Sequence, residues 1–126
     1  MEQYHGRKGT KTNGTGGKRH RSADKKLSLM GSPFTATKLG DKQVKVLLAG
    51  RGSTFKIKLK RATFVNVVTK DGIKKAKIRN VTESPANRNY ARQNIISKGT
   101  IVDTELGKVK VTNRVGQDGV VNGILA

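Results

Sequence analysis

The sequence contains no cysteine and no tryptophan, and only 4% of its 126 residues are aromatic. The lack of cysteine excludes disulfides and thiolate metal sites. The longest apolar run, Val46-Leu47-Leu48-Ala49, is far shorter than the ~20 residues of a transmembrane helix. The first 26 residues also lack the apolar stretch of a secretory signal. We therefore expect no membrane partner.

Acidic residues are scarce as well, with 8 Asp and Glu against 27 Lys and Arg, for a formal net charge of +19. A basic excess of this size indicates a polyanionic partner, with nucleic acid favoured over an anionic membrane surface. The acids are dispersed, and no carboxylate pair is positioned for acid–base work. His5 and His20 have no acidic partner at ligand spacing. We expect no catalytic residue, metal, cofactor or small-molecule substrate.

The composition divides the chain into two parts. All 12 Val and all 7 Ile residues lie at or after Val44, whereas residues 1–43 contain 7 of the 15 Gly residues. A segment so poor in apolar residues cannot bury enough surface to offset its ordering entropy. We expect residues 1–41 to form a basic, Gly-rich RNA-binding arm that is extended and is disordered when free. Residues 42–126 are expected to form the folded domain.

Strict alternation predicts a half-buried strand over residues 55–61. Its apolar members are expected to point inward: Phe55, Ile57 and Leu59. Its basic members are expected to form an outward-facing lysine comb: Lys56, Lys58 and Lys60. Such a comb either binds phosphates or protects a sheet edge from aggregation. Residues 42–49 alternate in the same way, with one face formed by Val44, Val46 and Leu48.

Turn signals predict hairpins in the second half of the chain. Asp71-Gly72 favours a two-residue type I′ turn. That turn would pair Val67 with Ala76 and Val65 with Ile78, all on one face. Further on, a three-residue loop is expected at Glu105-Leu106-Gly107, inward-facing valines at 109 and 111, and a turn at 116–119. Seven or so short antiparallel strands with one short helix predict a mainly β fold, a small closed or nearly closed β-barrel.

Ser84-Pro85 is expected to open the helix, because Ser suits the N-cap and Pro suits the first helical position. The helix would run to Arg92, about two turns. Arg88 and Arg92 would then lie on one face, where guanidinium groups can bind phosphate or base edges. Tyr90 is expected to pack into the core.

Four stretches of the sequence together resemble a known family. They are Thr15-Gly16-Gly17-Lys18-Arg19, Pro33 with Thr37-Lys38-Leu39-Gly40, the run Ser-Pro-Ala-Asn-Arg-Asn-Tyr that begins at Ser84, and the run Gly-Gln-Asp-Gly-Val that begins at Gly116. The sequence resembles, over almost its whole length, the S-eight-e family of small-subunit ribosomal proteins, and its short length resembles the archaeal form. One loop departs from the family's usual Arg-Gly-Gly, because this chain has Gly50-Arg51-Gly52-Ser53.

The resemblance implies a β-barrel body and a basic N-terminal extension laid on small-subunit ribosomal RNA. It also implies neighbouring small-subunit ribosomal proteins, a cytoplasmic location in the ribosome and no catalytic residues. We therefore expect a structural protein that stabilises ribosomal RNA through phosphate-backbone and shape contacts. A basic ribonuclease that uses His5 or His20, and a nucleoid-type DNA-binding protein, are the alternatives.

The expected RNA-binding residues are cations of the arm, the lysine comb and the short helix. They are Arg7, Lys8, Lys11, Lys18, Arg19, Arg21, Lys25, Lys26, Lys38, Arg51, Lys56, Lys58, Lys60, Arg88 and Arg92.

Overall fold

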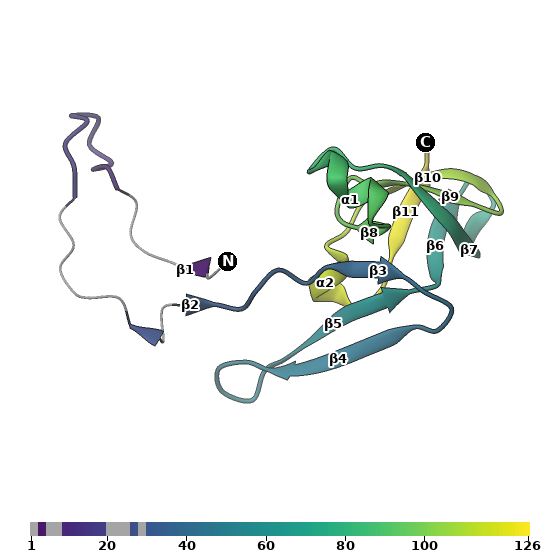
Figure 1. The fold of residues 1–126 in the computed structure, drawn as a ribbon, viewed down its shortest axis with the longest axis horizontal. Coiled ribbons are helices and arrows are strands. Elements are labelled where there is room, and N and C mark those ends of the chain that lie inside the picture. The colour runs from purple at the N-terminus through teal and green to yellow at the C-terminus, as the bar shows by residue number, and fades with distance from the viewer. Residues whose placement is uncertain (1–2, 5–8, 20–25, 28–29) are drawn as a thin grey trace. The chain divides into compact units, whose positions relative to one another are not determined.

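The computed structural model describes residues 3–4, 9–19, 26–27 and 30–126, and the chain divides into two compact units, Met1–Phe34 and Thr35–Ala126 (Figure 1). In the first unit, β1 (Gln3–Tyr4) pairs with β2 (Met30–Gly31) in antiparallel orientation. Thr10 and Lys18 form an isolated antiparallel bridge, and Lys11 N donates to Gly17 O at 2.9 Å. The described part of this unit therefore folds back on itself locally instead of being extended throughout.

The second unit begins before residue 42, where the sequence placed the start of the domain. β3 (Thr37–Leu39) pairs in parallel with β5 (Phe55–Ala62) and in antiparallel orientation with β8 (Ile95–Ile96). The Thr37 side chain is fully buried, and its hydroxyl donates to Leu59 O at 2.6 Å. Backbone pairing holds these three residues in the sheet, so a shortage of apolar side chains does not exclude them. The disorder of the free arm stays a prediction.

Five strands close into a barrel in the order β10-β11-β6-β7-β9, which confirms the mainly β barrel expected from the sequence. They are β6 (Phe64–Thr69), β7 (Gly72–Glu83), β9 (Ile101–Thr104), β10 (Gly107–Val111) and β11 (Asn122–Leu125). Neighbouring strands are antiparallel except β11 and β6, which run in parallel. The parallel pair lets the C-terminal strand close the barrel against its first strand.

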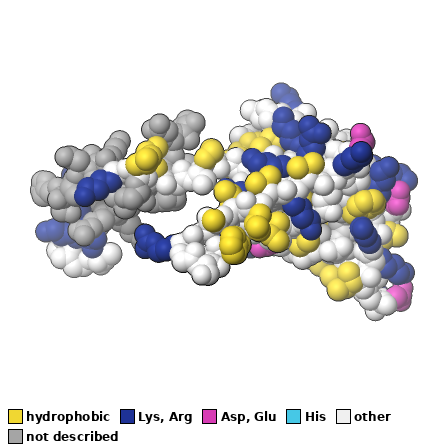
Figure 2. All heavy atoms as spheres, turned by 90° about the horizontal axis from the view of Figure 1, so that it is seen from below, with side chains coloured by type: hydrophobic (Ala, Val, Ile, Leu, Met, Phe, Trp, Pro, Cys, Tyr) yellow, Lys and Arg dark blue, Asp and Glu magenta, His cyan; other side chains and the backbone are white. Residues whose placement is uncertain are grey.

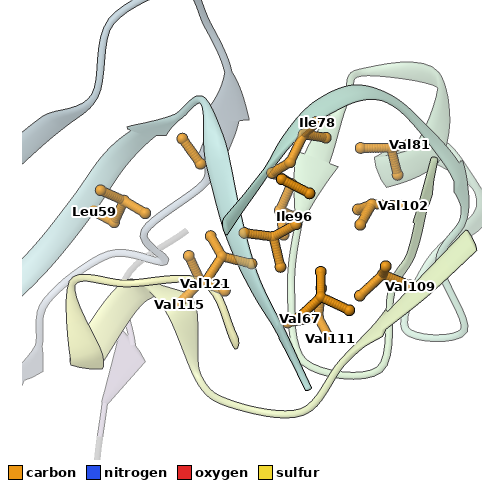
Figure 3. Packing of buried hydrophobic residues seen from close by; sticks show 13 residues of the cluster. Leu59, Val67, Ile78, Val81, Ile96, Val102, Val109, Val111, Val115 and Val121 are labelled. Carbon is orange, nitrogen blue, oxygen red and sulfur yellow. The ribbon is translucent and has the colours of Figure 1, made fainter. Parts of the chain in front are cut away.

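The barrel interior is filled by aliphatic side chains that point toward one another (Figure 3). Val65, Val67, Ala76 and Ile78 share this inner face, as the alternation predicted, and each is at most 3% exposed. Burying one such Val or Ile side chain stabilises a fold by roughly 1.5–3 kcal/mol. The inward positions of Val109 and Val111 are confirmed as well.

The remaining strand, β4 (Val44–Ala49), pairs with β5 in a four-stranded sheet of order β4-β5-β3-β8. The β4–β5 hairpin extends away from the barrel (Figure 1). The prediction that its apolar residues point inward is right for Leu59, which is fully buried, and wrong for Phe55 and Ile57, which are 64% and 42% exposed. Only the inner half of β5 is covered, by the short helix α2 (Val115–Asp118). Alternation identifies the faces of a strand, but a second layer must cover a face to bury it.

The hairpin turn expected at Asp71-Gly72 lies one residue earlier in the chain. β6 and β7 pair Thr69 with Gly72, so the two-residue loop is Lys70-Asp71. Val65 therefore pairs with Ala76, and Val67 pairs with Lys74, which leaves the faces unchanged but shifts the partners by two residues.

The loop between β9 and β10 contains two residues instead of three, because Thr104 pairs with Gly107. Both turns share one construction: the threonine hydroxyl donates to the glycine carbonyl at 2.7 Å. Gly72 and Gly107 have φ values of 127° and 116°, a region that L side chains rarely adopt. The Thr-x-x-Gly spacing, present in the sequence at both places, therefore indicates the strand register of both hairpins.

Helix α1 spans Arg88–Arg92 and begins later than Ser84-Pro85 predicted. Its N-cap is Asn87, whose side-chain oxygen accepts a hydrogen bond from Asn89 N at 2.9 Å. Asn is as good an N-cap as Ser, and Pro85-Ala86 instead form a turn after β7. Residues 116–119, expected as a turn, belong to α2 and its C-cap, Gly119. Neither helix in the described part of the chain is long and apolar enough to cross a membrane.

Candidate nucleic-acid interface

The folded unit carries most of the cationic charge of the chain. Residues 35–126 contain 19 of the 27 Lys and Arg and 6 of the 8 Asp and Glu, so their formal net charge is 19 − 6 = +13. Figure 2 shows these basic side chains spread among hydrophobic ones over one face of the unit. Every Lys and Arg in the described residues is exposed except Lys58, which is half-buried.

Within the described residues, all but one of these cations lack an ion-pair partner. The described residues form one ion pair, between Lys74 Nζ and Asp71 Oδ2 at 3.5 Å, and both side chains are exposed. An exposed pair of this kind contributes at most about 1 kcal/mol. The surface therefore presents an array of solvated cations that is complementary to a polyanion.

The lysine comb lies along β5. Lys56, Lys58 and Lys60 alternate on one strand, so they share a face at a spacing of roughly 6.6 Å. Val46 and Leu48 of β4 pair with Lys58 and Lys56, so apolar side chains lie beside the lysine stems. This arrangement holds cations at fixed intervals, which a flexible segment does not do.

The tip of the hairpin exposes Arg51. Gly50 N donates to Thr54 O at 2.7 Å, and the Thr54 hydroxyl donates to Arg51 O at 2.9 Å. These two hydrogen bonds close the loop around Gly52, whose φ is 69°. The loop that departs from the family pattern is thus a compact turn that presents one guanidinium group to solvent.

Arg88 and Arg92 are both exposed on α1, one helical turn apart. Tyr90 between them is half-buried and is not a member of the buried cluster, so its predicted core packing is only partial. Lys38 is also exposed, but it pairs with Arg61 of β5, whose parity differs from that of the comb. The structure therefore places Lys38 with Arg61 and apart from Lys56, Lys58 and Lys60.

In the arm, four of the expected RNA-binding residues are described and exposed: Lys11, Lys18, Arg19 and Lys26. The others lie outside the described residues, as do both histidines: Arg7, Lys8, Arg21, Lys25, His5 and His20.

One basic stripe was missed in the selection of candidate residues. Lys75, Lys77 and Arg79 alternate along β7 on the outer face of the barrel, and all three are exposed. Lys75 Nζ lies 4.4 Å from the centroid of the Phe64 ring, a cation–π geometry. The alternating Lys-x-Lys-x-Arg spacing is visible in the sequence and would have identified this stripe.

The acidic side chains of the described residues do not gather into a metal-binding group. No group of three or more metal-binding side chains occurs in the described part of the chain. Asp118 is occupied structurally, because its Oδ2 accepts from Arg114 N at 3.1 Å and from Asn113 Nδ2 at 3.0 Å. The exposed cations of the described residues can bind phosphate groups. The same residues contain no cluster of acidic side chains positioned for acid–base catalysis.

Comparison with known proteins identifies close relatives. The family described as ribosomal protein S8e matches residues 6–126. The small ribosomal subunit protein eS8 of Sulfolobus acidocaldarius is 46% identical over 127 residues, which cover 99% of this chain and 98% of that protein. The proteins of the same name from Staphylothermus marinus and Nanoarchaeum equitans are 50% and 47% identical, over 88% and 86% of this chain and 88% and 87% of their own lengths.

Proposed function

Since the chain belongs to the ribosomal protein S8e family, we propose that it binds small-subunit ribosomal RNA and stabilises its fold, mainly through phosphate contacts. The chain is a structural protein of the small ribosomal subunit that serves translation, and it is not an enzyme.

The observation that carries the proposal is the unpaired state of the surface cations. The folded unit has a formal net charge of +13, while the described residues form a single exposed ion pair. Each phosphate that a Lys or Arg neutralises releases a condensed counterion, which drives association without base contacts. The same array in a protein without a polyanionic partner would only add self-repulsion to the folded state.

The two units contribute differently to RNA binding in this proposal. The lysine comb, Arg51, Lys38 and the arginines of α1 present cations at spacings that the fold fixes. Residues 1–34 of the arm add eight Lys and Arg among glycines, which allow the backbone to approach phosphates closely. The folded unit then selects one RNA shape, and the arm, disordered in the free protein, adds affinity when it orders on the RNA.

Other small-subunit proteins are the further partners we propose, and the ribosome in the cytoplasm is the proposed location. The outer half of the β4–β5 hairpin favours neighbours of this kind, because Leu47 and Phe55 are 63% and 64% exposed. Exposed apolar surface of this extent usually marks a contact site.

Sedimentation of a cell extract tests the proposal. We expect the protein to co-sediment with the small ribosomal subunit at low salt and to leave it as salt rises. Treatment with ribonuclease should release the protein, and treatment with deoxyribonuclease should not. Release by deoxyribonuclease alone would favour the nucleoid alternative and overturn RNA binding.

A further inference from the structure

A pocket of about 630 Å³ opens on the folded unit beside the basic stripe of β7. Its volume falls within the ~300–1,000 Å³ range typical of pockets that take small organic molecules. Lys77 and Arg79 line it from β7, Asp41 from the β3–β4 connection, Asn94 from the short segment between α1 and β8, and Glu105 from the β9–β10 turn. Residues far apart in the sequence thus meet at this one place.

Hydrogen bonds fix the walls of the pocket. The Thr63 hydroxyl donates to Gly40 O at 2.8 Å, and Thr63 O accepts from Ile78 N at 2.9 Å. Asn94 O accepts from Leu39 N at 3.1 Å, which ties the opposite wall to β3. Asn94 also adopts a φ of 52°, the only positive φ among the described residues other than glycine. The pocket is therefore formed by the fold itself and needs no ligand to shape it.

Charges of both signs line the pocket without pairing with each other. No nitrogen of Lys77 or Arg79 lies within 4.0 Å of a carboxylate oxygen, since the one ion pair in the described residues is Lys74–Asp71. All four charged side chains at the pocket are exposed. The Asn94 Nδ2 group makes no hydrogen bond within the described part of the chain, while its Oδ1 accepts from Val81 N at 3.4 Å. Cations, carboxylates and an amide donor are all available to one ligand.

We propose that this pocket binds one unpaired nucleotide of RNA, with its phosphate at Lys77 and Arg79 and an amino-bearing base edge at Asp41 and Glu105. The proposal rests on RNA binding as the function of the chain. Lys75, two residues before Lys77 on the same face, extends the phosphate track along β7. The carboxylates of Asp41 and Glu105 repel a phosphate, because both groups are anions. Since a carboxylate only accepts hydrogen bonds, these two side chains favour a ligand group that donates them.

Base chemistry identifies which nucleotides fit. Cytosine donates two hydrogens from N4, and a carboxylate accepts them, whereas uracil carries an acceptor oxygen at the same position that a carboxylate repels. Adenine and guanine also carry an amino group on their base edges. A base inside a duplex has this edge occupied, so the nucleotide must be unpaired to enter. The pocket should therefore prefer cytosine to uracil at equal length and equal charge.

The experiment measures fluorescence anisotropy of the full chain with ten-nucleotide oligocytidylate and oligouridylate at one salt concentration. A third probe is a small-subunit ribosomal RNA fragment in duplex form. The carboxylate variant is Asp41→Asn with Glu105→Gln, and its matched control is Asp71→Asn with Glu83→Gln, which removes the same charge outside the pocket. The cation variant is Lys77→Gln with Arg79→Gln, matched by Lys108→Gln with Lys110→Gln on β10.

We expect the unaltered chain to prefer oligocytidylate at least about fivefold, the size of one good base contact. The Asp41/Glu105 variant should lose that preference. It should bind oligouridylate at least as tightly as the unaltered chain does, because its net charge is two units more positive. Its control should keep the preference. The Lys77/Arg79 variant should bind oligocytidylate at least about fivefold more weakly than its control does.

Equal binding of both oligonucleotides by the unaltered chain would overturn the nucleotide site and leave a protein segment with paired charges as the better ligand. A preference retained by the Asp41/Glu105 variant would overturn it as well. In both cases the duplex probe still binds if the chain is an RNA-binding protein, so failure of the site is distinct from failure of the proposed function. Loss of duplex binding by the unaltered chain contradicts the function itself.

Discussion

Residues 1–34 and the folded unit have nearly the same density of cations, but they differ in their apolar content. Residues 1–34 carry 8 Lys and Arg, and residues 35–126 carry 19, which is roughly one in four or five residues in each. Every Val and Ile residue lies in the second unit. Apolar content, and not charge, therefore distinguishes the two units, and the folded unit has the buried core over which strands hold cations at fixed spacings.

A comparison within the folded unit makes the same point. The lysines of β5 and the β7 stripe are both held by strands, but β7 is part of a closed barrel over a filled core, whereas the outer half of β5 has an uncovered apolar face. Side chains on the barrel should therefore be held more rigidly than those at the hairpin tip. The spacing of cations along a strand is more rigid when packed side chains cover the opposite face of that strand.

The largest effect should come from removing the core beneath the cations. Val67→Asp places a carboxylate at a fully buried position, which costs several kcal/mol and should unfold a domain of ordinary stability. The matched control is Val68→Asp at the next residue, which is 51% exposed and faces outward. Thermal unfolding followed by circular dichroism compares the two. If both variants unfold at the same temperature, the inner and outer faces of β6 are misassigned.

The next largest effect should be the salt dependence of RNA binding. If 6–10 phosphates are neutralised, affinity for ribosomal RNA should fall by roughly 10³–10⁵ between 50 and 200 mM salt, by analogy with duplex DNA. A chain lacking residues 1–34 should show a shallower slope and keep its preference for cognate over generic RNA. Filter binding at several salt concentrations measures both quantities. A deleted chain that binds cognate and generic RNA equally would place selectivity in the arm.

A smaller effect is expected from a change that conserves charge on α1. Arg88→Lys with Arg92→Lys should weaken binding to cognate ribosomal RNA by about fivefold or more, and binding to a generic duplex less. The physical reason is that lysine lacks the planar fork of arginine. Arg114→Lys at the N-cap of α2 serves as the control for an exposed arginine elsewhere. Unchanged affinity of the double variant for cognate RNA would show that the two arginines make no specific contact with it.

The smallest effect concerns the start of α1, which holds those arginines. Asn87→Ala removes the capping oxygen and should destabilise the folded unit by about 0.5–2 kcal/mol. Ser84→Ala should cost little or nothing, because the buried Ser84 hydroxyl has no hydrogen-bond partner. Urea denaturation resolves differences of this size. A larger loss for Ser84→Ala than for Asn87→Ala would restore the helix start that the sequence favoured.

Local sequence patterns predicted those features of the fold that depend only on neighbouring residues in the chain. The inner faces of β6, β7 and β10 follow from period-two alternation, since successive side chains on a strand point to opposite sides. The basic charge and the family motifs likewise needed no structure to identify a small-subunit ribosomal protein. The Lys-x-Lys-x-Arg stripe of β7 and the Thr-x-x-Gly turns also follow from local sequence patterns.

The remaining features depend on contacts between distant segments. Leu59 is buried and Phe55 is exposed on the same face of β5, because α2 covers one and nothing in the folded unit covers the other. Thr37 belongs to the folded unit because β3 pairs with β5 and β8, and the composition of residues 1–43 does not predict this pairing. The pocket at Lys77 brings together side chains from five separate stretches of the chain. The sequence by itself determined which side of each strand is apolar and that the chain carries a large excess of positive charge. Only the tertiary structure decided which apolar faces are covered and which charges meet, because both depend on packing between residues far apart in the chain.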